Sequence, residues 1–409
     1  MSGLDDRQAR AKTSRTMCAP AAAISGSLPM QSVVGVLTTI KAMGIGPPYP
    51  FAHSGCTRQN PGRTTQEPGF ACDVAEVSVN NGFTIFSGTA NPALAQSIAD
   101  ELGTQVGNCV LERYPTGEVA VQILESVRRK EVLLMQPTSP PTNDHLIELF
   151  ALADACHRAG SARIIAIVPF FGYGRADRRH GRREPIMARV VADLLEAVAI
   201  DHVVMVDPHT AQIEGFFHVP VDSLTAVPML CCALRGHLPL GIVIVAPDAG
   251  RVEMANRYAQ CLGAPVVVLH KRRISATETE VTHMAGEVSG RPCLIVDDMI
   301  STGATIAESI RALLKAGAQP GFTVAATHGL LVEDARGKLS HPAVREVLVT
   351  DTVDVRGKEW PRLRTISIAP LLAAALRRLM AGRSLRTDFL EAPRRTAPHR
   401  EEENREEET

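Results

Sequence analysis

Short apolar runs alternate with segments of helical periodicity from residue 83 onward. The runs have the length and β-branched content of strands, and they occupy residues 84–86, 132–135, 163–168, 203–206, 242–245, 266–269, 294–296 and 324–326. Between them, apolar residues recur three and four positions apart, which predicts helices over residues 91–102, 145–159, 186–199, 252–262 and 304–316. Strands that are apolar throughout and alternate with helices are typical of parallel sheets covered on both faces.

This alternation predicts an α/β protein with two doubly wound domains and mainly parallel sheets. We place the break near residues 225–228, which gives domains over residues 83–225 and 226–390. Residues 1–82 carry scattered Pro, Gly, Ser and Thr and little periodicity, so we expect a disordered extension there. Residues 391–409 end in a run of glutamates, which predicts a disordered acidic tail.

Composition narrows the class of protein. The 43 Lys and Arg nearly cancel the 44 Asp and Glu among 409 residues, which argues against a general nucleic-acid-binding surface. The nine cysteines include no CxxC pair, so we expect reduced, structural thiols in a reducing compartment. No apolar stretch approaches the ~20 residues that span a bilayer, and the chain start is a poor secretory signal. We therefore expect a cytoplasmic protein without a membrane partner, with weak organelle targeting left open by the basic residues at 7–15.

The most informative segment covers residues 294–305. A buried strand leads into Asp297 and Asp298, and a loop of small residues then opens a helix. Backbone N–H groups at a helix start can wrap a phosphate monoester, and the carboxylates can accept hydrogen bonds from vicinal sugar hydroxyls. The phosphate would be held by Ser301, Thr302, Gly303, Ala304 and Thr305. Together these features predict a ribose 5-phosphate site; the plainer alternative is an Asp cap on an ordinary strand–helix turn.

The residues after other predicted strands include candidate metal ligands and clusters of basic residues. His209 follows the strand at 203–206 and Asp248 follows the strand at 242–245, so both could approach one Mg²⁺ that bridges phosphate oxygens, although a structural role is an even alternative for each. Basic clusters at 171–183 and 270–273 also follow strands, which favours a triphosphate clamp over solvated surface. A Walker-type loop and a GxGxxG fingerprint are absent from the sequence, so a nucleotide would bind by other means.

These features together resemble the ribose-phosphate diphosphokinase family, also called phosphoribosyl pyrophosphate synthetases. The matching motifs lie at residues 86–91, 113–118, 171–175, 207–217, 247–250, 270–273, 297–305 and 327–329. The resemblance covers residues 83–390 and implies two tandem domains of the phosphoribosyltransferase type. It further implies transfer of the β,γ-diphosphoryl group of MgATP to the C1 hydroxyl of ribose 5-phosphate, which gives phosphoribosyl pyrophosphate and AMP.

The resemblance also implies a role for each matching residue. Lys271 and Arg273 would stabilise the transition state, and His209 with Asp248 would organise Mg²⁺. The ribose 5-phosphate residues would be Asp297, Asp298 and 301–305. The nucleotide would contact Arg175, Ala176, Asp177 and Arg183 and, from a neighbouring subunit, Tyr114, Thr116 and Glu118. Because one subunit completes the nucleotide site of another, the resemblance implies a homo-oligomer built from dimers, up to a hexamer.

Departures from the family pattern leave alternatives open. Ala176 replaces a common Gln, Thr116 replaces an Asp or Asn, and Pro208 stands where Leu is common. The nucleotide donor and the dependence on inorganic phosphate therefore stay open. One alternative function is a non-catalytic regulatory paralogue that assembles with an active synthetase, and another is a phosphoribosyltransferase that consumes the activated sugar. The retained Lys271 and Arg273 favour an active diphosphokinase.

Overall fold

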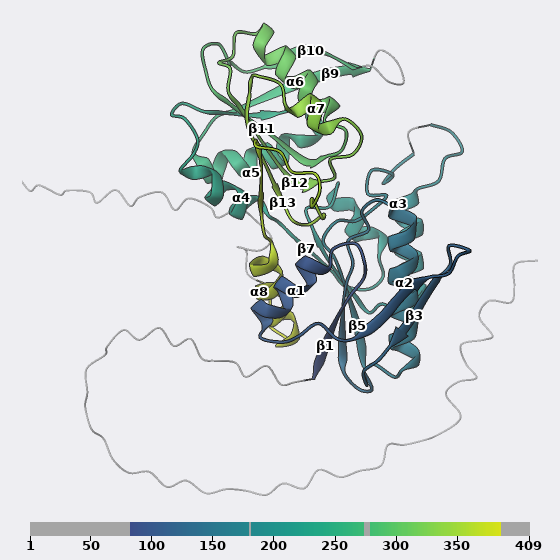
Figure 1. Ribbon diagram of the computed structural model, residues 1–409. Helices are drawn as coiled ribbons and strands as arrows, with labels where there is room; N and C mark the ends of the chain where they lie inside the picture. Colours follow the sequence, from purple (N-terminus) through teal and green to yellow (C-terminus); the bar gives the residue numbers. More distant parts are fainter. Residues whose placement is uncertain (1–81, 180, 274–278, 386–409) are drawn as a thin grey trace, which may run out of the picture. The chain divides into compact units, whose positions relative to one another are not determined.

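The computed structural model describes residues 82–179, 181–273 and 279–385, and it describes side chains outside residues 271–282 (Figure 1). The predicted acidic tail and all but the last residue of the predicted N-terminal extension lie outside the described residues. Of the helices in the described part of the chain, none combines the length and the apolar character needed to cross a membrane.

Five parallel strands form the first sheet. In sheet order they are β1 (Phe83–Ser87), β4 (Glu131–Met135), β5 (Arg163–Val168), β6 (His202–Val206) and β7 (Val221–Leu224). The helical elements of this region are α1 (Pro92–Leu102), α2 (Thr142–Arg158), α3 (Met187–Ala197) and the short 3₁₀ helix η2 (Ala211–Phe216). Because all five strands are parallel, their carboxyl ends meet at one edge of the sheet.

An antiparallel hairpin stands apart from this sheet. It consists of β2 (Cys109–Arg113) and β3 (Val119–Ile123) and carries residues 114–118 at its turn. Arg113 connects the hairpin to α2, because its Nη2 donates to Glu148 Oε1 over 2.8 Å. Glu148 also accepts from the backbone and hydroxyl of Thr89 and from Gln136. One buried carboxylate therefore ties the hairpin to the ends of β1 and β4.

Seven strands form the second sheet. In sheet order they are β10 (Thr279–Ala285), β9 (Val266–Arg273), β8 (Val243–Ala246), β11 (Cys293–Ile300), β12 (Phe322–Gly329), β13 (Val344–Thr350) and β14 (Leu363–Ile366). All neighbours are parallel except β10, which runs antiparallel to β9. The helical elements are α4 (Val227–Arg235), η3 (Ala249–Arg251), α5 (Val252–Leu262), α6 (Ala304–Lys315), α7 (Ala335–Leu339) and α8 (Ala369–Met380).

Both sheets are buried on both faces, as their continuously apolar strands predict. One face of the first sheet packs against α2 and α3, and one face of the second sheet packs against α6 and α7. The remaining two faces share a single apolar cluster with α1, α4, α5 and α8. The mainly parallel α/β architecture expected from the sequence is therefore confirmed.

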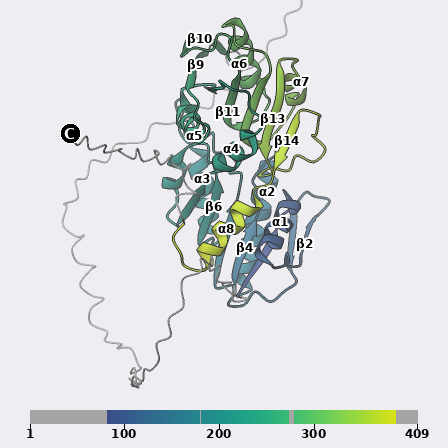
Figure 2. The same ribbon diagram turned by 90° about the vertical axis from the view of Figure 1, so that its left-hand side faces the viewer.

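The shared cluster links the two ends of the described chain. Helix α8 follows the last strand of the second sheet, yet it packs against α1 of the first, as Figures 1 and 2 both show. Asn91 adds a polar link, since its Oδ1 caps α1 at Leu94 while its Nδ2 donates to the carbonyl of Asp351 over 2.7 Å. The last strand of the first sheet ends at Leu224, and the next strand, which begins at Val243, belongs to the second sheet. Because α8 packs against the first sheet's α1, the domain boundaries at residues 225 and 390 stay a prediction.

Candidate active site

Strand β11 carries two carboxylates in its last half. The sequence places Asp297 and Asp298 after a strand that ends at residue 296, whereas β11 continues to Ile300 and both side chains belong to the strand. A continuously buried strand explains the difference, because all eight of its residues are shielded and the polar pair does not end the pairing with β12. The two carboxylates are therefore held by a rigid element.

The predicted phosphate loop follows directly. Gly303 adopts φ +72° immediately before α6, which begins at Ala304 as predicted. This left-handed conformation is open to glycine and strained for other residues. Lys338 Nζ donates to the carbonyl of Thr302 over 3.1 Å and fastens the loop to α7. The N–H groups at the start of α6 therefore lie near the carboxyl end of β11, a position suited to binding an anion.

Two segments distant in sequence bring cationic or imidazole groups to the carboxylates. His209 Nδ1 lies 2.7 Å from Asp298 Oδ2. Arg251 Nε lies 3.1 Å from Asp297 Oδ1, and Arg251 Nη2 lies 3.2 Å from Asp298 Oδ2. The same Nη2 is 2.8 Å from His209 Nδ1. The side chains of Arg251 and Asp298 are 12% and 2% exposed, so this polar cluster is largely shielded from water.

The pKa values of the two adjacent carboxyl groups are shifted in opposite directions. Burial and the neighbouring negative charge of Asp298 raise the pKa of Asp297 well above its ordinary value. Burial also acts to raise the pKa of Asp298, but the hydrogen bond with His209 and the charge of Arg251 outweigh it and lower that pKa. The pKa of Asp297 is therefore shifted upward and that of Asp298 downward by their different partners.

Asp207 positions the loop that carries His209. Its Oδ2 accepts from the backbone N–H of Ala226 over 2.9 Å and from the hydroxyl of Thr327 over 2.6 Å. The ring of His328 lies 3.1 Å from the carbonyl of Asp207 through Nε2. Since Thr327 and His328 lie on β12, Asp207 joins the end of β6 to the second sheet and fixes the approach of His209 to β11.

Asp248 and His209, the two predicted metal residues, have different surroundings. Asp248 Oδ1 accepts from the N–H of Gly250 over 2.8 Å and caps η3, while its charge also acts to raise the pKa of Asp297. His209 faces Asp298 and Arg251. Within the described residues no group of three or more His, Cys, Asp and Glu side chains is arranged to hold a metal ion.

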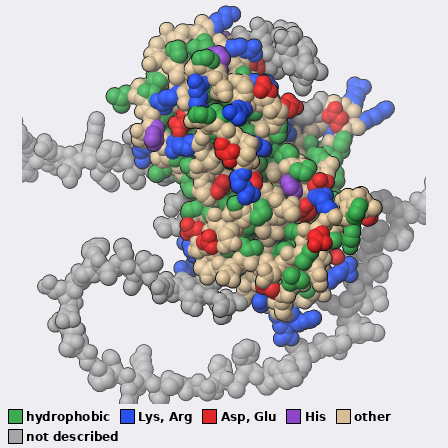
Figure 3. Space-filling model, in the orientation of Figure 1, with side chains coloured by type: hydrophobic (Ala, Val, Ile, Leu, Met, Phe, Trp, Pro, Cys, Tyr) green, Lys and Arg blue, Asp and Glu red, His purple; other side chains and the backbone are tan. Residues whose placement is uncertain are grey.

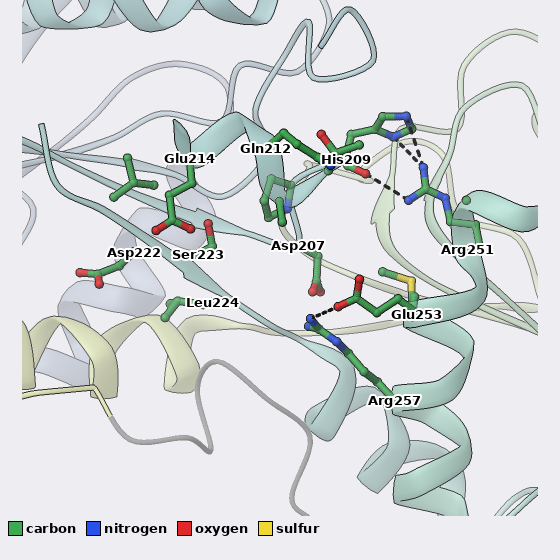
Figure 4. A pocket seen from close by; sticks show the side chains of 16 residues that line it. Asp207, His209, Gln212, Glu214, Asp222, Ser223, Leu224, Arg251, Glu253 and Arg257 are labelled. Carbon is green, nitrogen blue, oxygen red and sulfur yellow. Dashed lines mark hydrogen bonds and ion pairs between the residues drawn. The ribbon is translucent and has the colours of Figure 1, made fainter. Parts of the chain in front are cut away.

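A pocket of about 580 Å³ opens beside this cluster (Figure 4). Its walls come from the segment after β6, from β7, and from the start of α5. Figure 4 shows the guanidinium of Arg251 pointing towards His209, and Glu253 directed at Arg257, whose Nη2 donates to Glu253 Oε1 over 2.8 Å. The pocket thus adjoins the polar cluster at His209 and Arg251.

The predicted nucleotide residues occupy two exposed segments. In the loop after β5, Asp177 Oδ2 accepts from the hydroxyl of Thr210 over 2.8 Å, which places that loop next to His209. Arg175 and Arg183 are exposed, and Ala176 is partly exposed. At the hairpin turn, Thr116 donates to Glu118 over 2.8 Å, and the side chain of Tyr114 is exposed. The hairpin residues make no hydrogen bond with the cluster around Asp298 among those seen in the described part of the chain.

The predicted catalytic residues Lys271 and Arg273 lie at the carboxyl end of β9. Their side chains lie outside what the structure describes, so their role stays a prediction. Strand β9 neighbours β8, whose end leads to Asp248, so the backbone at both ends belongs to the same edge of the sheet. Elsewhere on the face seen in Figure 3, acidic and basic side chains are interspersed, in keeping with the near-zero net charge.

Sequence reasoning missed Arg251 and Asp207. Arg251 comes directly after the loop 247–250, which the sequence analysis singled out, and it ends η3 at the carboxyl side of β8. Its position after a strand end was a usable signal. Asp207 ends a buried strand in the same way, but only the three-dimensional contact with β12 shows that it joins the two sheets.

Comparison with known proteins gives consistent matches over the described chain. Two family models match, the N-terminal domain of ribose phosphate pyrophosphokinase over residues 83–198 and the phosphoribosyl synthetase-associated domain over residues 273–390. A ribose-phosphate pyrophosphokinase of Ralstonia nicotianae is 40% identical over 315 residues, which are 76% of this chain and 99% of that protein. One from Maricaulis maris is 42% identical over 298 residues, 72% of this chain and 96% of that protein. The crystal structure of phosphoribosylpyrophosphate synthetase from Mycobacterium smegmatis matches with a TM-score of 0.69 and 40% identity, covering 74% of this chain and 99% of that one.

Proposed function

The chain belongs to the ribose-phosphate pyrophosphokinase family, and we propose that its described residues support transfer of the β,γ-diphosphoryl group of ATP to ribose 5-phosphate. The C1 hydroxyl oxygen attacks the β-phosphorus and its proton passes to solvent. The bond from that phosphorus to the oxygen shared with the α-phosphate breaks, and AMP leaves. The observation that carries the proposal is the placement of Asp297 and Asp298 on the strand whose end opens the loop at 301–305.

Ribose 5-phosphate would bind along this strand and loop. The N–H groups of residues 301–305 and the positive end of the α6 dipole attract the 5-phosphate. The ribose hydroxyls donate to the carboxyl groups of Asp297 and Asp298, of which Asp298 has the lowered pKa. Because both elements are rigid, the sugar is oriented before reaction, and orientation is a large part of catalysis in phosphoryl-type transfer.

Magnesium is proposed as the cofactor, with Asp248 and His209 as its predicted protein ligands. Mg²⁺ in such sites is held by one or two carboxylates together with substrate phosphates, so the carboxylate of Asp248 at a strand end fits the ion. When bound, Mg²⁺ neutralises charge on the triphosphate oxygens. His209 contributes through its ring, which in this structure is oriented by Asp298.

Cations of the chain would bind the rest of the triphosphate. Arg175 and Arg183 are exposed in the loop that Asp177 fastens to Thr210, next to His209. Lys271 and Arg273 at the end of β9 are proposed to stabilise the charge that develops on the transferred group. The nucleotide base is proposed to reach Tyr114, Thr116 and Glu118 of a neighbouring subunit, which would make the active unit a homo-oligomer. A cytoplasmic location is proposed from the sequence features alone.

The test is an AMP-release assay with ribose 5-phosphate and MgATP, run with and without inorganic phosphate and with alternative nucleoside triphosphates. We expect AMP to form with ribose 5-phosphate and not with ribose, because the phosphate loop has nothing to bind in the free sugar. Lys271→Ala and Arg273→Ala should each reduce the rate by about 10²–10³-fold, as removal of a transition-state donor does elsewhere. Absence of AMP with every donor would refute the proposal.

The departures from the family pattern at Thr116, Ala176 and Pro208 favour one alternative function, that of a non-catalytic regulatory paralogue that acts on an active synthetase. The same assay separates the two. A chain that is silent alone but changes the rate of an added active synthetase is regulatory, whereas a chain that forms AMP by itself is the enzyme. Release of pyrophosphate with a nucleobase in place of AMP would mark a phosphoribosyltransferase.

A further inference from the structure

Two cysteine side chains meet where α4 packs against α5. Cys231 of α4 is 1% exposed and Cys261 of α5 is partly buried, and both pack in the apolar cluster that these helices share with the two sheets. The thiol of Cys231 donates a hydrogen bond to the sulfur of Cys261. Neither residue is part of a disulfide. The helix pair therefore holds two reduced thiols in contact, and one of them is partly exposed to solvent.

Arg235 makes a second contact between the same two helices. It lies four residues after Cys231 and so on the same face of α4, and its Nη2 donates to the backbone carbonyl of Cys261 over 2.9 Å. Tyr258, three residues before Cys261 on α5, is fully buried, and its hydroxyl has no hydrogen-bond partner among the described residues, so it does not compete for either sulfur. Helix packing therefore fixes the contact between the two thiols.

The two thiols differ in acidity. The hydrogen bond from Cys231 lowers the pKa of Cys261 to about 7, burial opposes this shift, and the charge of Arg235 supports it. The same hydrogen bond, together with burial, raises the pKa of Cys231. The thiolate is the nucleophilic form of a cysteine, and exposed thiolates are the ones that peroxides oxidise. Cys261 is therefore the member of the pair that reacts first, with a protonated thiol beside it.

We infer that Cys261 and Cys231 form a peroxide-responsive site, in which Cys261 is the attacking thiol and Cys231 resolves the product to a disulfide. The Cys261 thiolate attacks one oxygen of hydrogen peroxide, the O–O bond breaks, and hydroxide leaves, which gives a sulfenic acid on Cys261. The sulfur of Cys231 then attacks the sulfur of Cys261. The S–O bond breaks, and the hydroxyl group leaves as water with the proton of Cys231.

The electrons and protons of this sequence balance. The two thiols together lose two electrons, and one peroxide molecule is reduced to two molecules of water. The second water forms when the released hydroxide takes up the proton that Cys261 lost on ionising. Small thiols of a reducing compartment reduce the disulfide again by exchange. The site is thus compatible with the reduced cysteines that the sequence predicts.

The experiment treats the reduced full-length chain with hydrogen peroxide at pH 7, blocks the remaining thiols with N-ethylmaleimide, and maps the products by mass spectrometry without reduction. We expect a disulfide between Cys231 and Cys261 that dithiothreitol reverses. Oxidation of Cys261 should be at least about tenfold faster than that of Cys156, a fully buried thiol whose pKa is raised to about 12 by burial. Cys156 therefore serves as an internal reference.

Two variants assign the roles of the thiols. Cys232→Ala is the matched control, since it removes the exposed thiol next to Cys231 and should form the disulfide at the wild-type rate. Cys231→Ser removes the resolving thiol, so the sulfenic acid on Cys261 should accumulate and be trapped by dimedone. If Cys231→Ser does not fold, as judged by circular dichroism, the wild type and Cys232→Ala still decide the inference.

Three results would overturn the inference. They are a disulfide that is lost in Cys232→Ala, oxidation of Cys261 no faster than that of Cys156, and a stable sulfenic acid on Cys261 of the wild type without a disulfide. None of these measurements uses a substrate of the proposed reaction. A failure of AMP release and a failure of disulfide formation are therefore distinguishable.

Discussion

The imidazole of His209 and the carboxylate of Asp298 are 89 positions apart in sequence, and their Nδ1 and Oδ2 atoms lie 2.7 Å apart. His209 follows the end of β6 in the first sheet, and Asp298 belongs to β11 in the second. Asp207 makes the junction rigid through Thr327 on β12. The proposed active site therefore depends on the contact between the two sheets, and buried polar groups hold the loop of His209 in place there.

Asp298→Asn tests that junction. The amide keeps the shape of the side chain but loses the charge that faces His209 and Arg251, and it replaces one of the two oxygen acceptors with a donor. We expect the rate of AMP release to fall by about 10²–10³-fold, together with weaker ribose 5-phosphate binding measured by isothermal titration calorimetry. Asp354→Asn is the control, because Asp354 pairs with Arg356 at a solvent-exposed turn. Unchanged ribose 5-phosphate affinity in Asp298→Asn would contradict the assignment.

Subunit mixing tests the proposed sharing of the nucleotide site. Glu118→Ala removes a hairpin residue and Asp298→Asn removes a ribose residue, so each variant alone should release little AMP. In oligomers co-expressed at equal levels, a site that combines Glu118 of one subunit with Asp298 of another is intact in about one quarter of cases. We expect about that share of the wild-type rate. If both residues served one site within a single chain, co-expression would restore no activity.

Gly303 and Gly103 provide a matched pair of left-handed glycines. Gly303 has φ +72° before α6 and Gly103 has φ +70° after α1. Alanine costs about 1–2 kcal/mol in this conformation, so both variants should lose similar stability in urea unfolding. Only Gly303→Ala should raise the KM for ribose 5-phosphate, by about tenfold, which corresponds to about 1.4 kcal/mol. A Cβ there would lie 3.4 Å from Leu339 Cγ, an ordinary contact, so the expected change in KM comes from the backbone of the loop and not from a clash. An equal KM in the two variants would contradict the assignment of the loop 301–305 to phosphate binding.

Glu148 gives the protein an acid-sensitive link between the hairpin and the first sheet. Burial acts to raise its pKa, but hydrogen bonds from Thr89 and Gln136 outweigh this and lower it. A lowered pKa in the folded state stabilises the protein above the unfolded value of about 4.3, and this stabilisation is lost as the pH falls through the lower folded value. Glu148→Gln should therefore melt roughly 2–8 °C lower at pH 7.

Thermal melts from pH 7 to pH 3 check the linkage. The difference in melting temperature between wild type and Glu148→Gln should shrink below about pH 4, because the wild type then loses the charge that the variant lacks. Glu125→Gln is the control, since Glu125 is only partly buried and accepts only from Asn108 in the contacts seen among the described residues. A difference that stays constant over the whole pH range would contradict the lowered pKa.

The sequence predicted the architecture wherever strands are continuously apolar. Strand β5 has the predicted bounds, but β13 was missed because Arg345 and Glu346 interrupt its apolar pattern. The hairpin of β2 and β3 was missed for a related reason. Its apolar runs are only three residues long, and the residues of both strands are partly buried or exposed. The pattern of apolar residues along the sequence reflects burial, so strands at the margin of the core are harder to predict from it.

The candidate site was predicted in its parts but not in its contacts. Parallel strands bring their carboxyl ends to one edge, and this rule was enough to select Asp298, His209 and Asp248 from the sequence. It could not show that His209 is adjacent to Asp298 and not bonded to Asp248, because that depends on how the two sheets pack. Nor could it show that the side chain of Arg251 turns back from η3 to β11.

Cys261 provides a last test, away from the site, at the contact of α4 and α5. A hydrogen bond with Cys231 lowers the pKa of Cys261 to about 7, burial opposes this shift, and the nearby charge of Arg235 supports it. About half of the Cys261 thiol is then ionised at pH 7, compared with a few per cent for an ordinary thiol of pKa about 8.5.

We expect Cys231→Ala to slow alkylation of Cys261 by iodoacetamide roughly tenfold at pH 7, measured on the isolated peptide by mass spectrometry. Cys231→Ser retains a hydroxyl donor and should keep most of the rate. Equal rates in the wild type and Cys231→Ala would show that the partner thiol has no influence, whereas a rate that recovers above pH 9 in Cys231→Ala would place its effect on the ionisation of Cys261.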